Sequence, residues 1–201
     1  MQEEYPCVMA QSVFQTDHVS YAEYTDFGNK GNAQKILVNL ENYIAATDIG
    51  SHDFQTFIAA FPHEKIQDEL HFETLLWQQL QHLHEADDQP WDPQVSKDPE
   101  SGKFSFSLKG QAFFLIGMHP LSSRKARQSP FPCIAFNFHW QFEKLREMNV
   151  YEQVQKRIRD RDKDLQGNIN PMLADFGEES EVYQYSGRYV EKSWKCPFHH
   201  K

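Results

Sequence analysis

A histidine followed by a proline, His119-Pro120, stands at the end of an apolar stretch over residues 111–118. A continuous apolar run of this length, bounded by Lys109-Gly110 and by Pro120, predicts a strand that is buried on both faces. Proline disfavours the helical conformation in the residue before it, so we expect His119 to be extended at the carboxyl end of this strand, where open sheets place ligand sites. His119 is therefore the first candidate ligand, and the alternative is a half-buried histidine that donates to a backbone carbonyl.

Arginines gather in the second part of the chain, and none precedes Arg124. A guanidinium grips carboxylates and phosphates with a planar fork, so we expect the carboxyl-terminal half to hold any anionic ligand. Arg124 and Arg127 follow the candidate ligand directly, and Arg188 is a third candidate. With His119, a second histidine at His139 and many aromatic residues, these arginines form the inventory that holds haem: an axial imidazole, apolar walls for the macrocycle and guanidinium groups for the propionates.

Other common catalytic and metal motifs are absent from the sequence. It contains no HExxH zinc motif, no Gly-x-Ser-x-Gly nucleophile motif and no glycine-rich phosphate loop. His82 and His84 are two residues apart, so on a helix they point in different directions and cannot clamp one ion. Cys7, Cys133 and Cys196 form no CxxC pair, and a thiol of this kind is usually buried and inert.

Composition limits the class of protein. A chain of 201 residues, 39% hydrophobic and 14% aromatic, predicts one domain over residues 1–201 with one good-sized core. A formal charge of -9 argues against a nucleic-acid partner, which needs a basic face. The start lacks a secretion signature, no apolar run approaches the roughly 20 residues that span a bilayer, and the cysteines suggest no disulfide framework. We therefore expect a cytoplasmic protein with no membrane partner, and a homodimer is compatible with the sequence.

The first half of the chain alternates polar loops with strongly patterned segments. Residues 1–31 are expected to be loop-rich, and Asn32 is expected to cap a helix over residues 33–46. Residues 54–61 are short, aromatic and ended by proline, which predicts a strand. Residues 68–85 predict a helix with one apolar stripe, made of Leu70, Leu76, Trp77, Leu80, Leu83 and His84. The acidic, proline-rich segment 87–102 is either a surface loop or a lid.

The second half predicts the rest of the sheet. Residues 104–108 and 112–118 flank a Lys-Gly-Gln turn and predict a hairpin, and residues 133–138 predict a further strand. Helices are expected at residues 140–148 and 151–165, with Asn149 between them, followed by an irregular tail. The fold class is therefore α/β, close to α+β: a single domain with a mixed central sheet, packed helices and a long irregular carboxyl-terminal segment.

Several segments carry a resemblance to a known family. They are Tyr5-Pro6-Cys7, Gly117-Met118-His119-Pro120, Ser123-Arg124, Ala126-Arg127, the stretch 136–146, the stretch 158–162, the stretch 165–172, Tyr185-Ser186-Gly187-Arg188 and Cys196-Pro197-Phe198. On these motifs the chain resembles the YqcI/YcgG family, and in particular its short branch of N-hydroxylases of the guanitoxin-biosynthesis type. The resemblance extends over nearly the whole chain and is most specific in its carboxyl-terminal motifs.

The resemblance implies a haem-dependent oxygenase, an oxidoreductase of the monooxygenase kind that binds iron as haem b. It would use O2 and an external electron donor to hydroxylate a guanidine or amine nitrogen of an amino-acid-like small molecule. The family's Gly-x-His-Pro motif falls on His119, which is expected to be the proximal ligand. His139 matches the short branch alone, so we expect it in the distal pocket or near a propionate. Cys7 and Cys196 match family positions and are rival thiolate ligands.

The remaining roles follow from charge. Arg124 and Arg127, with Arg188 as a third, are expected to neutralise the propionates. A cationic substrate needs a carboxylate, and Glu143, one helical turn beyond His139, is the first candidate, with Glu181 in the polar tail as the second. Two alternatives remain open: a haem sensor or storage protein without turnover, and a haem-free acid–base hydrolase built on His119, Glu143 and Arg124.

Overall fold

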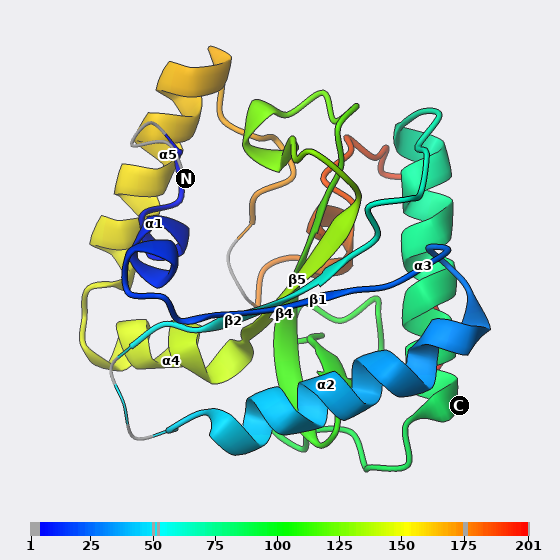
Figure 1. Cartoon of the computed structure of the whole chain (residues 1–201). Coiled ribbons are helices and arrows are strands. Elements are labelled where there is room, and N and C mark those ends of the chain that lie inside the picture. The colour runs from blue at the N-terminus through cyan, green and yellow to red at the C-terminus, as the bar shows by residue number, and fades with distance from the viewer. Residues whose placement is uncertain (1–4, 50, 52, 175–176, 201) are drawn as a thin grey trace.

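A five-stranded mixed sheet forms the centre of the protein in the computed structural model, which describes residues 5–49, 51, 53–174 and 177–200. The strand order is β1-β2-β5-β4-β3, with β1 parallel to β2 and every other neighbouring pair antiparallel (Figure 1). The strands are β1 Val19–Glu23, β2 Thr56–Ala60, β3 Phe106–Leu108, β4 Gln111–Met118 and β5 Cys133–Phe138. This architecture confirms the predicted mixed α/β fold.

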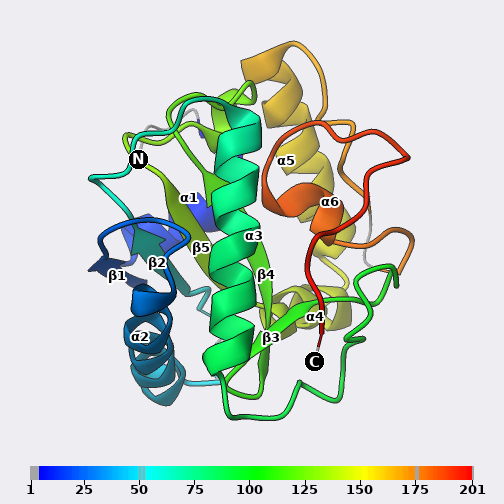
Figure 2. The same cartoon turned by 90° about the vertical axis from the view of Figure 1, so that its right-hand side faces the viewer.

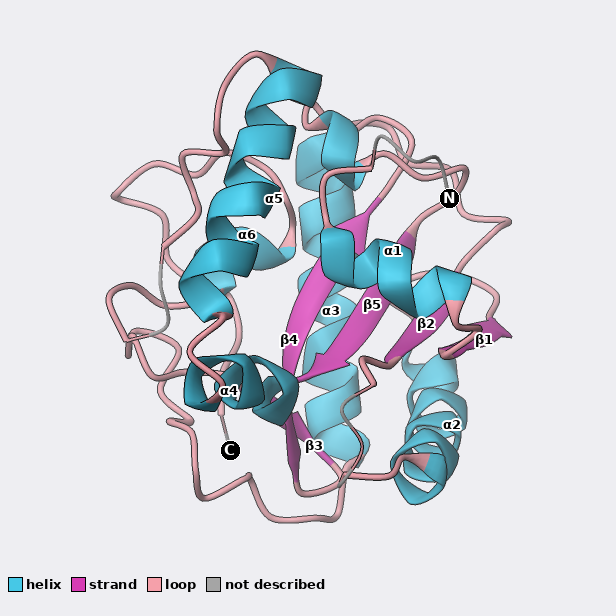
Figure 3. Cartoon of the chain, turned by 90° about the vertical axis from the view of Figure 1, so that its left-hand side faces the viewer, coloured by secondary structure: helices cyan, strands magenta, loops and turns pink. Residues whose placement is uncertain are grey.

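Helices cover both faces of the sheet. Among the described residues they are α1 Val8–Gln15, α2 Ala33–Ala46, α3 Glu69–Ala86, α4 His139–Glu147, α5 Tyr151–Gln166 and α6 Val182–Tyr185, with short 3-10 turns η1 Lys30–Asn32 and η2 Lys125–Arg127. Figure 2 shows α3 crossing one face of the sheet with α2 beside it. Figure 3 shows α1, α4 and α5 on the opposite face. Within the described residues, no helix combines the length and the apolar character needed to cross a bilayer.

The two faces of the sheet differ in packing, and β4 shows the difference most clearly. Phe113, Leu115 and Gly117 are buried against the α3 side, where aromatic side chains form the main core. Alternate residues, Phe114, Ile116 and Met118, are half-buried on the other side. The prediction that this strand is buried on both faces is therefore wrong, because its second face borders a cavity.

Most elements predicted from the sequence are present, including the helices over 33–46 and 68–85 and the hairpin. The predicted break at Asn149 is also present: this residue has a φ of 57° and lies between α4 and α5. The loop-rich assignment of residues 1–31 is wrong for α1 and β1, two short elements without a long apolar run. Leu70 does not belong to the buried stripe of α3, since it is 59% exposed. The Asn32 side chain does not cap α2, because its amide donates to the carbonyls of Thr25 and Asp26.

The outer edge of β4 is closed by side chains instead of a strand. Strand β3 pairs only with residues 111–113, so the carbonyls further along β4 need other donors. The Ser105 hydroxyl donates to the Phe113 carbonyl at 3.2 Å. The Arg127 guanidinium donates to the Gly117 carbonyl at 3.2 Å and to the Gln184 carbonyl of α6 at 3.0 Å. These bonds fix α6 and its flanking residues against the sheet.

Gly117 is a point of close packing between β4, α3 and α6. A Cβ atom at this position would lie 2.7 Å from the Tyr185 carbonyl oxygen and 2.8 Å from the Phe72 ring. We predict that Gly117→Ala lowers the free energy of unfolding by about 1–3 kcal/mol, because neither backbone nor core ring can move away without loss of packing. Chemical denaturation monitored by tryptophan fluorescence measures this change.

The matched control is Gly31→Ala, where the added Cβ would meet only the exposed Asn29 side-chain oxygen, at 3.1 Å. We expect its free energy of unfolding to change by about 0.5 kcal/mol or less. Equal effects at the two positions would contradict the packing argument.

Candidate functional site

A large cavity lies between the sheet and the three helices α1, α4 and α5. Its volume is about 1340 Å³. This exceeds the roughly 300–1,000 Å³ of an ordinary small-molecule pocket. The sheet side of the cavity is apolar and is formed by residues of three neighbouring strands: Ile58, Phe114, Ile116, Met118, Cys133 and Ala135. Polar groups enter from the helices and from the chain segments at the ends of the strands.

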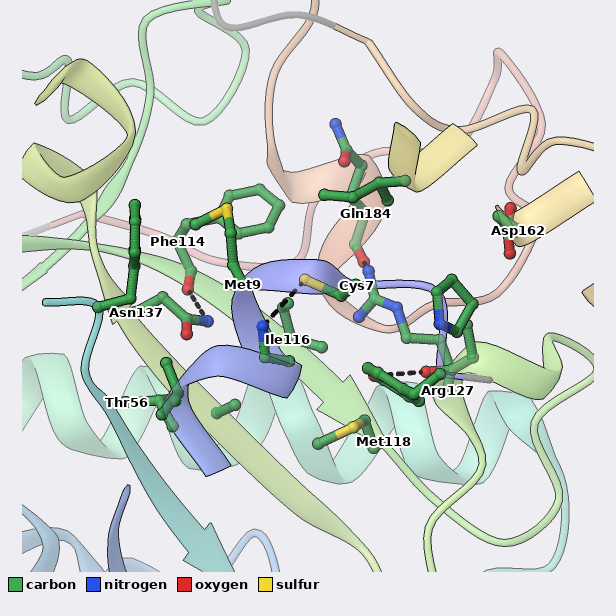
Figure 4. Close-up of a pocket in the computed structure, with 18 of the residues that line it drawn as sticks. Cys7, Met9, Thr56, Phe114, Ile116, Met118, Arg127, Asn137, Asp162 and Gln184 are labelled. Carbon is green, nitrogen blue, oxygen red and sulfur yellow. Dashed lines mark hydrogen bonds between the residues drawn. The ribbon is translucent and has the colours of Figure 1, made fainter. Parts of the chain in front are cut away.

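Cys7 lies in the wall of this cavity, at the start of α1. Its sulfur accepts a hydrogen bond from the Ala10 amide at 3.4 Å, which caps the helix. The preceding Tyr5 hydroxyl donates to the Ala126 carbonyl at 2.9 Å and so ties this segment to η2. Figure 4 shows the Cys7 side chain beside the Arg127 guanidinium. Burial is the main cause that raises the pKa of the Cys7 thiol, so the free protein holds it protonated.

Arg127 is a buried cation that also lines the cavity. Its guanidinium donates to two backbone carbonyls, and no carboxylate of the described residues lies within ion-pair distance of it. Burial lowers the pKa of Arg127, yet a guanidinium stays charged in proteins. A buried charge without a counter-ion is costly, so this position favours an anionic ligand.

Arg124 lies at the same end of the cavity but is already neutralised. Its guanidinium forms a short ion pair with Asp162 of α5 and also donates to the side chain and carbonyl of Asn168. The Asp162 carboxylate accepts a further hydrogen bond from the Asn170 amide at 3.1 Å. Arg124 therefore joins α5 and the following loop to the end of the sheet.

His139 and Glu181 face each other at the other end of the cavity wall. The His139 Nδ1 atom lies 3.8 Å from Glu181 Oε1. Burial lowers the pKa of His139, so the imidazole is neutral at pH 7. Burial also raises the pKa of Glu181 to about 8, although hydroxyl groups of Ser105 and Tyr185 lie 3.1 Å from its Oε2 atom. Both groups are therefore mainly uncharged at neutral pH.

Glu143 is next to His139 but does not line the cavity. Its Oε1 atom lies 3.4 Å from His139 Nε2, and the same carboxylate is tied to Arg146 by a short ion pair. Its side chain is 42% exposed. Of the two carboxylates proposed to hold a cation, Glu181 is thus the one that borders the cavity.

His119 lies on the opposite side of the sheet from this cavity. Its ring stacks on Phe72 of α3, with centroids 4.3 Å apart, and the residue is fully buried. Neither ring nitrogen has a hydrogen-bond partner among the described residues. Burial lowers the pKa of His119, which keeps the imidazole neutral. The His119 amide donates to the Arg127 carbonyl at 3.0 Å, which ties the residue after β4 to the end of η2.

Arg188 and Cys196 also lie away from the cavity, on the α3 side. Arg188 forms an ion pair with Glu73 at 2.6 Å, and the Ser186 hydroxyl donates to the same carboxylate at 3.2 Å. Cys196 packs on the main aromatic core, where burial raises its pKa to about 12. Neither residue is among those that line the cavity.

The structure therefore divides the candidate residues into two groups. Those brought together at the cavity are Cys7, Arg124, Arg127, His139 and Glu181. Those placed elsewhere are His119, Glu143, Arg188 and Cys196, so the three residues of the hydrolase alternative do not converge. The cavity floor was not predicted from the sequence, because Phe114, Ile116 and Met118 are as apolar as the alternate residues of β4 that pack towards α3.

The segment 87–102 is not part of the cavity wall among the described residues. Its Trp91 packs on Phe104, Phe106 and Phe198, with ring centroids 5.7–6.1 Å apart. The Asp92 carboxylate accepts a hydrogen bond from the Ala112 amide at 3.0 Å. The segment thus behaves as a surface loop packed at the β3 edge of the sheet.

The fold and the site define a mixed α/β protein whose second sheet face encloses a large cavity with a thiol, an imidazole, a guanidinium and a buried carboxyl group. The chain belongs to the YqcI/YcgG family, whose sequence model matches residues 1–199. It is 27% identical to the uncharacterized protein YqcI of Bacillus subtilis (strain 168), over 97% of this chain and 80% of that protein. It is also 27% identical to the uncharacterized protein YcgG of the same strain, over 96% and 80%. No solved structure matches the chain significantly.

The buried Glu181 carboxyl predicts a pH-dependent stability difference. A folded-state pKa of about 8, against an ordinary value of 4.5, means that the folded protein binds the proton more tightly. Its stabilising contribution is therefore complete below about pH 4.5 and is lost as the pH rises towards 8. Glu181→Gln is neutral at every pH, so its melting temperature should match that of the wild type near pH 5 and exceed it increasingly up to pH 8.

Differential scanning calorimetry across this pH range tests the prediction, with the exposed Glu178→Gln as control. The pKa of His139 is lowered, so its effect on stability has the opposite dependence on pH. The wild type and Glu181→Gln share this effect, so it largely cancels in the difference between their melting temperatures. A melting-temperature difference that does not change between pH 5 and pH 8 would show that Glu181 is ionised in the folded protein.

Proposed function

We propose that this protein holds haem b in the cavity and uses O2 with external electrons to hydroxylate a guanidine or amine nitrogen of an amino-acid-like substrate. The observation that carries the proposal is the cavity itself, which joins an apolar floor to a thiol and to a buried guanidinium without a carboxylate partner. The resemblance to N-hydroxylases in the motifs around Cys7, Arg127 and His139 is the second support.

The cavity residues fit such a cofactor in three respects. Its size leaves room for a macrocycle together with a small substrate. The floor made by β2, β4 and β5 is apolar, as the faces of a porphyrin require. Arg127 offers an uncompensated positive charge to a propionate, whereas Arg124 is held by Asp162 and would act mainly by keeping the wall in place.

Three residues are candidate donors to the iron. Cys7 lines the cavity, and a thiolate there would favour O–O cleavage. His119 has the family motif and two buried nitrogens without partners, but its ring is covered by Phe72 on the other side of the sheet. The geometry favours Cys7, with His119 as the alternative and Cys196 as a third donor remote from the cavity.

Bound haem would supply the activation of O2, and the protein residues would position and deprotonate the substrate nitrogen. A protonated nitrogen has no lone pair to react, so a group that can accept its proton must lie beside it. His139 is neutral, borders the cavity and can accept a hydrogen bond or a proton at a ring nitrogen. We assign it this role in the proposed reaction.

A cytoplasmic location is part of the proposal. All three cysteines are free, as expected in a reducing compartment. A haem sensor or storage protein shares the same cavity requirements, and turnover alone separates it from an oxygenase.

We predict that Cys7→Ala loses most of the Soret absorbance of protein prepared with excess haem, while its circular dichroism is unchanged. His119→Ala should retain haem, because its ring does not border the cavity. Cys133→Ala is the matched control, since Cys133 is a second buried thiol in the same cavity wall. Loss of haem in His119→Ala with retention in Cys7→Ala would instead assign the iron to His119, and the absence of any Soret band in the wild type would end the haem proposal.

We also predict turnover. Anaerobically reduced protein, exposed to O2 with a panel of arginine-like and amine compounds, should yield a product heavier by one oxygen atom, as measured by mass spectrometry. The oxygen should come from ¹⁸O2 and not from labelled water. If the reduced protein only autoxidises with every compound, the sensor or storage function replaces the oxygenase.

A further inference from the structure

We propose that Glu181 is a switchable counter-ion: it is uncharged in the empty cavity, ionises when a cationic ligand binds, and releases its proton through His139 to Glu143. The inference rests on the proposed function only for the positive charge of the ligand and not for its oxidation.

The geometry of Glu181 leaves one oxygen free for this role. Its Oε2 atom is held by the Tyr185 hydroxyl and the Ser105 hydroxyl, each at 3.1 Å. Its Oε1 atom faces His139 Nδ1 at 3.8 Å, and the residue lines the cavity while being only 5% exposed. Oε1 is therefore the oxygen from which a proton can pass to the histidine.

The groups around Glu181 do not supply a permanent positive charge. No lysine or arginine of the described part of the chain lies within ion-pair distance of it. From α4, Arg146 attracts and Glu143 repels its negative charge, and these two side chains are paired with each other. From α6, Tyr185 is un-ionised because burial raises its pKa well above the ordinary value. Desolvation thus dominates and keeps the acid protonated near pH 7.

A cation in the cavity would reverse this balance. An opposite charge a few ångströms away in a low-dielectric site strongly favours the carboxylate over the acid, which lowers the pKa of Glu181. The other carboxylates at the cavity are less suited, because Asp162 is paired with Arg124, while Asp17 and Glu179 are exposed. Among the carboxylic acids of the described residues that line the cavity, Glu181 is therefore the best suited to pair with a cation.

The released proton has a continuous set of acceptors to the surface. Glu181 Oε1 gives its proton to His139 Nδ1 as the 3.8 Å gap closes by side-chain rotation. His139 Nε2 then gives a proton to Glu143, 3.4 Å away, and the imidazole is neutral again. Glu143 is 42% exposed and passes the proton to water. Asp92 raises and Arg146 lowers the pKa of His139, so these two effects oppose each other.

Isothermal titration calorimetry of the wild-type protein, with haem supplied but without reductant, tests the proposal. The probes are butylguanidinium, which stays charged at every pH used, and butylurea, its uncharged analogue. In phosphate and Tris buffers at pH 7, butylguanidinium should release close to one proton per bound molecule and butylurea none. The affinity of the protein for butylguanidinium should rise about tenfold for each unit by which the pH is raised, up to pH 8.

Glu181→Gln should bind butylguanidinium more weakly and without proton release, whereas binding of butylurea should be unchanged. With a pH-indicator dye in stopped flow, His139→Gln should slow the proton release about a hundredfold without changing its final amount. Binding of butylguanidinium without proton release, equal affinity for the two probes, or no binding of butylguanidinium would each overturn the proposal. An unchanged rate in His139→Gln would overturn the route. Because no O2 or electrons are used, these outcomes are independent of whether N-hydroxylation occurs.

Discussion

The open outer edge of β4 is the constraint on which the rest of the structure depends. Because β3 is only three residues long, most carbonyls on that edge need donors from outside the sheet. Arg127 supplies one by bridging the Gly117 and Gln184 carbonyls, and Ser105 supplies another. The same contacts place α6 against the sheet, and with it Glu181 at the cavity. A local shortage of backbone donors thus determines where the site is built.

The two sides of the sheet are specialised for stability and for ligand space. The α3 side is filled by interlocking aromatic rings, such as Phe113 and Phe138 with centroids 5.0 Å apart. The other side carries half-buried residues under α1, α4 and α5, and there the packing leaves a cavity. Well-packed interiors contain few voids larger than a water molecule, so a cavity of this size beside a dense core indicates a functional feature of the fold.

The hairpin, the other central strands and the long helices could be predicted from the sequence, because their patterns are strong and local. The sequence could not predict which side of the sheet each candidate residue would face. His119 follows the same alternation as Phe113, Leu115 and Gly117, which places it with α3, but only tertiary packing decides that the cavity lies on the other side. Glu181 comes from a segment without periodicity, and its position is fixed by a long-range bond to Ser105 together with a local bond to Tyr185.

The empty cavity carries two opposite electrostatic costs. Arg127 is charged, buried and bonded to neutral carbonyls, whereas Glu181 is an acid that avoids its charge because it lacks a cation. An anionic group beside Arg127 and a cationic group beside Glu181 would each remove one of these costs. Replacing Arg127 by an apolar residue would leave the Gly117 and Gln184 carbonyls without their donor, and replacing Glu181 would leave the Tyr185 hydroxyl without its acceptor. These bonds require polar groups but not ionisable ones, so the charges at the two positions favour ligands of opposite charge.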